Sequence, residues 1–297
     1  MEFFPKFAPL SFQDKPLVDL FLKKEQPTIS EMTFANMYAW RKTELVEASL
    51  LGKSMVLRGR RKDGDVTYAP PVGADDKVQI VKTLIGHSLK EGSTFLMRGI
   101  VEPLATRLAE EGYELAPDRN NWDYVYLTSD LANLPGPKFY GKRKEIKKFR
   151  SRYRHECKKI TPSIIQKCVE FQEEWYSIRN CRGLYSLMEE NYTILDALQD
   201  FDKLGLSGLA VFVDGELVAF SIGEMLNDNT WVTHFEKASP EIQGLYQYIN
   251  QQIALEVLPN YMFINREQDL GEKGLRMSKT SYHPHHMVEK NMLLVEK

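Results

Sequence analysis

The sequence contains few cysteines and no long apolar run. Its three cysteines, Cys157, Cys168 and Cys181, are spaced by eleven and thirteen residues, which fits neither a disulfide framework nor a zinc knuckle. A membrane-spanning helix needs about 20 consecutive apolar residues, and the amino-terminal segment lacks the basic and apolar regions of a secretory signal. We therefore expect a cytoplasmic protein with reduced thiols and no transmembrane segment.

The motifs of several enzyme classes are also missing. The sequence has no glycine-rich phosphate loop of the Walker type, no Gly-x-Ser-x-Gly elbow and no His-Glu-x-x-His helix. His283, His285 and His286 lie close together, but no cysteine is near them and Glu289 is the nearest carboxylate. We therefore expect no metal site, and neither hydrolase nor nucleoside triphosphatase activity has support in the sequence.

Positive charge is concentrated in one stretch, at 138–159. This stretch has eleven Lys or Arg against two acids, although the formal net charge of the whole chain is −2. Its apolar or thiol residues recur at steps of three and four, which predicts an amphipathic helix over 138–160. These residues are Ile146, Phe149, Tyr153, Cys157 and Ile160.

The basic helix is either a solvated connector between two domains or a contact for a polyanion. RNA phosphate, a phospholipid head group and cofactor phosphates are all suitable polyanions. We favour a polyanion because charge this concentrated is self-repelling, which a plain connector would avoid. The candidate phosphate-binding residues are Lys138, Lys142, Arg143, Lys147, Arg150 and Arg154.

The same order of elements is predicted on each side of this helix. A helix precedes three antiparallel strands, and a helix, a strand, a helix and a strand follow. In the first half the strands are 44–51, 54–60, 66–70 and 94–101, with a last hairpin formed by 113–116 and 122–127. In the second half they are 206–213, 216–226, 230–237, 261–266 and 287–295. The sequence therefore predicts two related α/β domains, 1–137 and 161–297, joined by the helix at 138–160.

Four segments resemble the carboxy-terminal domain of phosphatidylglycerol lysyltransferases. They are TFANMYAW at 33–40, KFYGKRKEIKKFRSRY at 138–153, HFEKA at 234–238 and INREQDLGEKGLRMSKTSYHP at 264–284. This resemblance implies two tandem GNAT domains, the acyl-CoA N-acyltransferase fold shared with Fem-type aminoacyltransferases. Each domain would be a mixed, mainly antiparallel sheet flanked by helices, with the acyl donor in the gap where strands four and five splay apart. The chain differs from the full-length enzymes in having no predicted membrane region.

The resemblance also implies the chemistry. An amine or hydroxyl acceptor would attack the donor directly, with aminoacyl-tRNA or acyl-CoA as co-substrate and no permanently bound cofactor. tRNA or an anionic phospholipid head group would then be the partner of the basic helix. Two alternatives stay open. One is a coenzyme A-dependent N-acetyltransferase that binds phosphate at Gln243 and Gly244, before a helix; the other is a non-catalytic module that binds RNA or anionic lipid.

The strand at 261–266 leads into a cluster of polar residues. Ligands usually bind at the carboxyl edge of an α/β sheet, where Arg266 can clamp a carboxylate or phosphate while Glu267 and Asp269 hold an amino group. A plain polar loop and an exposed helix face are the structural alternatives. The candidate substrate-binding residues are Asn265, Arg266, Glu267, Asp269, Arg276, Lys279 and Tyr282.

Three residues are candidates for the general base that deprotonates the acceptor. His234 and Glu236 share a face of their strand by its two-residue period, and Glu224 of the preceding strand can lie across from them. The spacing distinguishes none of the three, and a structural role is equally compatible with each. We expect the second domain to carry the site, since Arg98 and Gly99 end the equivalent strand of the first without a polar cluster.

Overall fold

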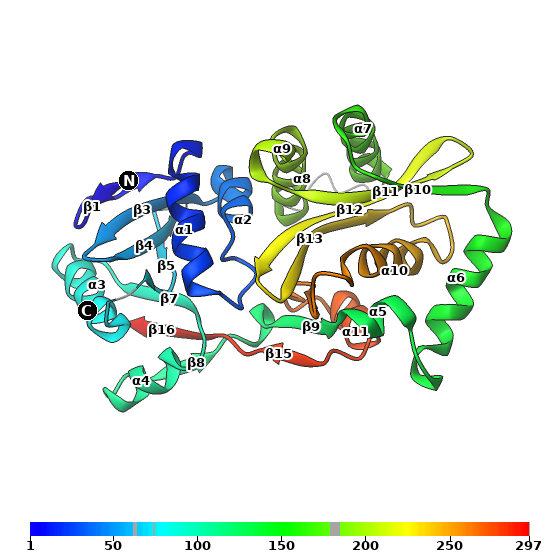
Figure 1. The fold of residues 1–297 in the computed structure, drawn as a ribbon. Coiled ribbons are helices and arrows are strands. Elements are labelled where there is room, and N and C mark those ends of the chain that lie inside the picture. Colours follow the sequence, from blue (N-terminus) through cyan, green and yellow to red (C-terminus); the bar gives the residue numbers. More distant parts are fainter. Residues whose placement is uncertain (62–63, 74, 179–184, 297) are drawn as a thin grey trace. The chain divides into compact units, whose positions relative to one another are not determined.

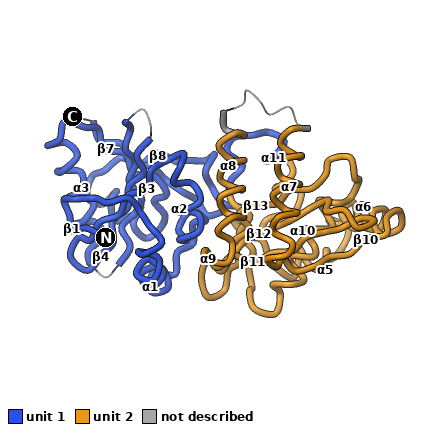
Figure 2. The backbone as a smooth tube through the Cα atoms, turned by 90° about the horizontal axis from the view of Figure 1, so that it is seen from above, with its two compact units in different colours: residues 1–123, 268–276, 287–297 blue, residues 124–267, 277–286 orange. Residues whose placement is uncertain are grey.

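The computed structural model describes residues 1–61, 64–73, 75–178 and 185–296. The chain forms two compact units, each built from separate segments (Figure 2). Unit 1 comprises Met1–Asp123, Gln268–Arg276 and Met287–Lys297, and unit 2 comprises Tyr124–Glu267 and Met277–His286. The ranges expected from the sequence, 1–137, 138–160 and 161–297, are each continuous, whereas neither compact unit is.

A mixed sheet forms the centre of unit 1, with nine strands among the described residues. Its main path runs β1-β3-β4-β5-β7-β16-β8, while β2 pairs with β3 and β6 pairs with β4. Most neighbours are antiparallel, and β1–β3 and β5–β7 are parallel. The strands are β1 Glu2–Phe3, β2 Ala8–Pro9, β3 Leu45–Leu51, β4 Ser54–Arg60, β5 Val66–Tyr68, β6 Val72–Gly73, β7 Phe95–Ile100, β8 Leu115–Pro117 and β16 Asn291–Val295.

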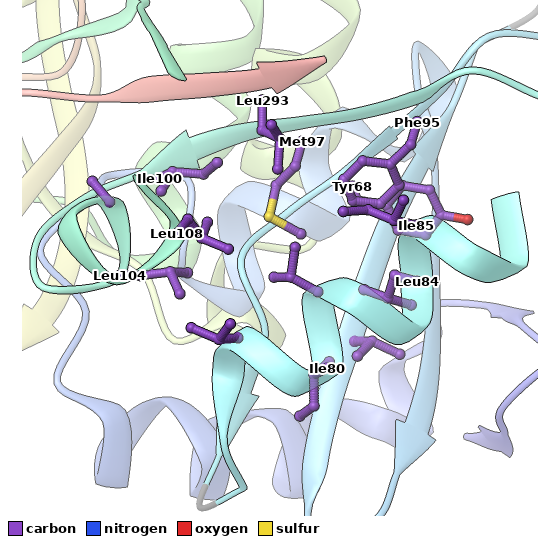
Figure 3. Close-up of a cluster of buried hydrophobic side chains, with 14 residues drawn as sticks. Tyr68, Ile80, Leu84, Ile85, Phe95, Met97, Ile100, Leu104, Leu108 and Leu293 are labelled. Carbon is purple, nitrogen blue, oxygen red and sulfur yellow. The ribbon is translucent and has the colours of Figure 1, made fainter. Parts of the chain in front are cut away.

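Four α-helices of unit 1 are α1 Lys15–Glu25, α2 Phe34–Ala39, α3 Lys77–Lys90 and α4 Leu104–Glu110. Asp76 caps α3, because its carboxylate accepts the backbone N–H of Val78. The apolar faces of α3 and α4 pack on β5, β7 and β16 to form a core (Figure 3). This core includes Ile80, Leu84, Phe95, Met97, Leu108 and Leu293. Since Leu293 belongs to β16, a strand late in the sequence completes the core of unit 1.

A buried charge cluster, here called the Lys290 cluster, ties distant segments of unit 1 together. The Lys290 ammonium donates to both carboxylate oxygens of Glu31, at 2.8 and 2.6 Å, and to Asp123 Oδ1 at 2.7 Å. The Ser30 N–H donates to the other oxygen of Asp123, at 2.8 Å. The side chains of Lys290 and Asp123 are 1% and 0% exposed. Asp123 is the residue at which the chain leaves unit 1, so the cluster fixes that point.

The second sheet forms the centre of unit 2 and has seven strands in the described part of the chain, in the order β10-β11-β12-β13-β14-β9-β15. β10 to β13 are antiparallel, and β13 and β14 are parallel. The predicted type I′ turn between β11 and β12 is confirmed, since Asp214 and Gly215 both have positive φ. The strands are β9 Asp123–Leu127, β10 His155–Lys159, β11 Ser207–Val213, β12 Glu216–Asn227, β13 Thr230–Ala238, β14 Phe263–Asn265 and β15 His286–Val288.

Helices cover both faces of this sheet in unit 2. α7, α8 and α9 lie on one face and α10 on the other (Figure 1). The helices are α5 Thr128–Asn133, α6 Tyr140–Arg152, α7 Pro162–Ile178, α8 Tyr185–Gln199, α9 Phe201–Leu204 and α10 Leu245–Val257. α11, Lys273–Thr280, begins in unit 1 and ends in unit 2.

Two predictions about strands are wrong, and the errors are related. The strands at 113–116 and 122–127 do not form a hairpin, because β8 pairs with β16 and β9 with β14. The predicted strand at 287–295 is two strands, β15 and β16, in different sheets. Each sheet therefore takes a strand from the other half of the sequence. Alternation along one strand shows which side chains are buried but not which strand pairs with it.

The predicted basic helix over 138–160 is too long. α6 ends at Arg152, and Tyr153 already has extended backbone angles, with φ −124° and ψ 134°. From Tyr153 to Cys157 half-buried and exposed residues alternate, and β10 pairs with β11 as an edge strand. Pairing with an existing sheet thus outweighs the helical periodicity of the last residues.

Candidate active site

The candidate site lies in unit 2, where β13 and β14 separate. Their parallel pairing joins Thr230–Val232 to Phe263–Asn265. β13 then continues through His234 and Glu236, while the chain beyond β14 turns away from it. The two strands splay at this point, which places the side chains that follow β14 beside those of β13.

Backbone hydrogen bonds fix the turn after β14. The Arg266 N–H donates to the Tyr124 carbonyl at 2.9 Å, and the Tyr124 N–H donates to the Glu267 carbonyl at 3.1 Å. The Lys279 ammonium donates to the Arg266 carbonyl at 2.6 Å, and Asn265 Oδ1 accepts the Glu267 N–H at 2.8 Å. Glu267 has a φ of +59°, in the left-handed region that few non-glycine residues adopt. Such conformations cluster at functional sites.

His234 lies between two carboxylates. Its Nε2 is 3.0 Å from Glu224 Oε1 and its Nδ1 is 2.8 Å from Glu267 Oε1. Burial lowers the pKa of His234, but the hydrogen bonds and charges of Glu224 and Glu267 outweigh burial and raise the pKa to about 9. His234 is therefore a cation at neutral pH, with both ring N–H groups donating to carboxylates.

The pairing of β12 and β13 skips His234. Ile222 pairs with Phe235 and Gly223 pairs with Thr233, so His234 is the extra residue of a β-bulge. A bulge interrupts the two-residue alternation and redirects side chains, often beside active sites. Alternation alone therefore does not decide which residues share a face across this position, and the side chains of His234 and Glu236 have different hydrogen-bond partners.

Glu236 is paired with Arg266. Arg266 Nη2 donates to Glu236 Oε1 at 3.1 Å, and the two side chains are 13% and 11% exposed. The guanidinium carbon lies 4.9 Å from the centre of the Tyr282 ring and 5.7 Å from that of Tyr126. Burial raises the pKa of both phenols, so they are neutral at physiological pH.

Three buried polar atoms around this ion pair have no hydrogen-bond partner among the described residues. They are Arg266 Nη1, Glu236 Oε2 and Ser221 Oγ. Ser221 pairs directly with Glu236 across β12 and β13, so their side chains are neighbours. A buried polar group without a partner costs about 1–3 kcal/mol. The three atoms therefore offer one set of donors and acceptors to a polar ligand.

Lys142 of α6 belongs to the same cluster. Its ammonium donates to Ser281 Oγ at 2.7 Å and lies 3.9 Å from the centre of the Tyr282 ring. Burial, and then the positive charge of Arg266, lower the pKa of Lys142 to about 8. The sequence predicts a phosphate contact for Lys142, whereas the structure brings its side chain to Tyr282 and near Arg266.

The other candidate phosphate-binding residues have varied surroundings. Lys147 and Arg154 are exposed. Arg143 donates to the carbonyls of Leu134 and Gly136 and so holds the chain that follows α5. The remaining two contact neighbouring side chains: Lys138 pairs with Asp130 at 3.2 Å, and Arg150 donates to Gln251 at 3.4 Å.

Gln243 and Gly244 pack against α6. Gly244 has a φ of +85°, and a Cβ there would lie 2.3 Å from the Glu145 carbonyl oxygen. Gln243 Nε2 donates to Glu145 Oε2 at 2.7 Å. Close helix packing and a left-handed backbone thus give a structural reason for the glycine.

Asp269 and Arg276 belong to unit 1. Arg276 makes two hydrogen bonds to the fully buried Asp269 carboxylate, at 2.9 and 2.8 Å, and Arg119 adds a third at 3.1 Å. Asp269 is thus engaged by two arginines within unit 1, whereas Lys279 and Tyr282 contribute to the cluster in unit 2.

Sequence patterns missed Ser221 and Tyr126. Ser221 is an ordinary small residue in an apolar strand, and only its pairing with Glu236 places it beside the ion pair. Tyr126 is in β9, which the sequence assigned to the first domain, although β9 pairs with β14. The alternation of tyrosines at 124 and 126 indicated a strand but not the sheet to which it belongs.

Mixed sheets flanked by helices, with a splay beside a polar cluster, define a protein of the tandem GNAT class. The chain belongs to the family described as phosphatidylglycerol lysyltransferase, C-terminal, whose model matches residues 23–293. No curated protein matches the chain. In the described residues, no helix is long and apolar enough to cross a bilayer.

Solved structures with a similar fold include three that cover nearly the whole chain. A conserved protein of unknown function from Bacteroides thetaiotaomicron is 33% identical, with a TM-score of 0.92 over 98% of this chain and 99% of that one. L-PGS from Bacillus licheniformis is 14% identical, with a TM-score of 0.67 over 94% and 91%. A tandem GNAT protein from the clavulanic acid biosynthesis pathway is 13% identical, with a TM-score of 0.52 over 97% and 98%. The last two likenesses show the fold alone.

Proposed function

We propose that the chain is a transferase that moves an aminoacyl or acyl group to an amine or hydroxyl acceptor, at the Arg266–Glu236 pair. The observation that carries this proposal is the set of buried atoms without partners, Arg266 Nη1, Glu236 Oε2 and Ser221 Oγ. A guanidinium N–H donates to a carbonyl oxygen, and a carboxylate oxygen accepts from an ammonium group. An aminoacyl group has both of these ends, so it matches the set.

Direct attack of the acceptor on the donor carbonyl suits this arrangement. Arg266 would donate to the carbonyl oxygen as it gains negative charge, while Glu236 and Ser221 hold the amino group. Lys279 holds the Arg266 backbone through its hydrogen bond to the carbonyl. His234 would act as a positioning residue, because it holds the carboxylate of Glu267, the residue that follows Arg266 in the chain.

Aminoacyl-tRNA is the co-substrate that the surroundings favour. Lys147 in α6 and Arg154, just after the end of α6, are both exposed. They can therefore neutralise a phosphate backbone. At the start of α10, where a coenzyme A phosphate would bind, Gln243 instead holds the Glu145 carboxylate, which has the same sign of charge as phosphate. An anionic phospholipid head group is a candidate acceptor, by likeness to the family.

The test is a binding titration against bulk aminoacylated tRNA, uncharged tRNA and acetyl-coenzyme A, at low and moderate salt. We expect charged tRNA to bind better than uncharged tRNA, with affinities that fall steeply with salt. Arg266→Gln should remove the preference for charged tRNA, and Arg107→Gln, an exposed change in unit 1, should keep it. Tight acetyl-coenzyme A binding without a tRNA preference would make the chain an acetyltransferase, and binding of RNA or anionic vesicles without transfer would make it a non-catalytic module.

A further inference from the structure

Lys142 differs from its neighbours on the basic helix. Its side chain is half-buried and directed to Ser281 and the face of Tyr282. The same ring has the Arg266 guanidinium at 4.9 Å. Two cations thus share one tyrosine, which is costly unless one of them can lose its charge.

The groups around Lys142 favour its neutral form. Arg266 is the charged group that acts on it, and Ser281 and Tyr282 are neutral partners. The Glu236 carboxylate is hydrogen-bonded to Arg266. Chiefly because of burial, the pKa of Lys142 is lowered to about 8. About a tenth of the protein molecules would therefore have a neutral Lys142 amine at pH 7.

Four other titratable side chains of the cluster are poorly suited to accept a proton. Both ring nitrogens of His234 already donate to Glu224 and Glu267. Tyr126 and Tyr282 are phenols whose pKa values are raised by burial, so they have no basic form near neutral pH. Glu236 is the counter-charge of Arg266 and would be occupied by the amino group of the substrate.

We infer that Lys142 accepts the proton of the attacking nucleophile, and that it is a catalytic residue and not a phosphate contact. This inference rests on the proposed function. The acceptor nitrogen or oxygen forms a bond to the donor carbonyl carbon, and its proton passes to the neutral amine of Lys142. The bond from that carbon to the donor oxygen or sulfur breaks, and the electron pair leaves with the donor atom. That atom takes the proton from the Lys142 ammonium, so no further reactant is needed.

The first test is the pH profile of transfer, measured with the donor that the titration selects. The wild-type rate should rise with pH through about 8 and then level off. Lys142→Arg keeps the positive charge but cannot deprotonate, so its rate should fall at least tenfold and lose this rise. Lys90→Arg, an exposed change on α3 in unit 1, should keep both the rate and its profile.

A second test measures the amine itself and needs no activity. Competitive labelling with acetic anhydride, followed by mass spectrometry, should acetylate Lys142 at lower pH than the exposed Lys90. Arg266→Gln should move the labelling of Lys142 to higher pH. Equal labelling of the two lysines, or an unchanged pH profile in Lys142→Arg, would overturn this inference and leave the proposed function standing. Absence of transfer from every donor by the wild-type chain would overturn both.

Discussion

At the scale of single residues, a substitution of Ser221 tests whether the buried polar atoms form a ligand-binding site or serve only the structure. The buried Ser221 hydroxyl has no partner within the described chain, so Ser221→Ala should raise the free energy of unfolding, by up to about 1–3 kcal/mol. Ligand affinity should fall by about 3- to 10-fold, because one hydrogen bond to the bound group is lost. Chemical denaturation would measure the change in stability. Titration with the donor that the binding experiment selects would measure the change in affinity.

Ser88→Ala is the matched control for that substitution. Ser88 is also buried, but its hydroxyl donates to backbone carbonyls of unit 1. We expect a loss of about 1 kcal/mol of stability with unchanged affinity. The assignment of Ser221 to a ligand site would be contradicted if Ser221→Ala lost as much stability as Ser88→Ala and still bound ligand with normal affinity.

His234 should make stability depend on pH. Its pKa rises from 6.5 to about 9 on folding, so its stabilising effect is complete below about 6.5 and is lost as pH rises through about 9. The free energy of unfolding should fall by roughly 3 kcal/mol across this window. Denaturation at intervals from about pH 6 to 10 would measure the fall, which His234→Gln should abolish and His87→Gln should leave in place. A wild-type curve that is flat over this range would refute the cation assigned to His234.

The sequence predicted much of the chemistry at this scale and little of its geometry. It located Arg266 and Glu267 directly after a strand and proposed that Glu224 lies across from His234, to which Glu224 is hydrogen-bonded. It could not show that a bulge at His234 separates the partners of His234 from those of Glu236. Cross-strand register decides such contacts, and no single strand encodes it.

At the scale of elements, the packing of α6 against the start of α10 predicts that two Gly→Ala substitutions change stability in opposite directions. Gly244→Ala should lower stability by well over 1 kcal/mol, because its backbone is left-handed and its Cβ would meet the Glu145 carbonyl. Gly141→Ala, inside α6 with nothing within 4 Å of its Cβ, should raise stability by about 0.5–1 kcal/mol. Thermal and chemical denaturation would measure both. A Gly244→Ala protein as stable as the wild type would show that the two helices do not pack closely.

Element boundaries show where periodicity is informative. The first turns of the basic stretch form a helix with Ile146 and Phe149 buried, as the three- and four-residue spacing predicts. From Tyr153 onward the same spacing is also compatible with alternation, and the available edge of β11 decides the outcome. Short segments with both patterns depend on what lies beside them.

At the scale of the whole molecule, the Lys290 cluster should contribute strongly to stability. Lys290→Met leaves the Asp123 carboxylate buried without its cation, which should cost about 3–5 kcal/mol. Adding Asp123→Asn should recover part of the loss, because the more deeply buried of the two unpaired carboxylates, Asp123 and Glu31, is then replaced by a neutral amide. Urea denaturation of both variants would measure this, and Lys90→Met, which is exposed, should change little. Equal stability of Lys290→Met and the wild type would show that the cluster is not a major contributor.

The repeated order of elements predicted two related α/β domains, and the structure has two mixed sheets flanked by helices. The exchange of β9 and β16 was beyond prediction, because each has the composition of the strand expected in its own half. Only the register of distant segments distinguishes a continuous domain from an exchanged one.

The position of β16 has a consequence for synthesis. It lies between β7 and β8, although more than half of the chain's length separates it from both. The ribosome therefore synthesises β7 and β8 long before β16, the strand that pairs with both. During that interval the nascent chain exposes unpaired strand edges, which invite aggregation. Newly made protein should depend on chaperones that shield these edges until translation reaches β16.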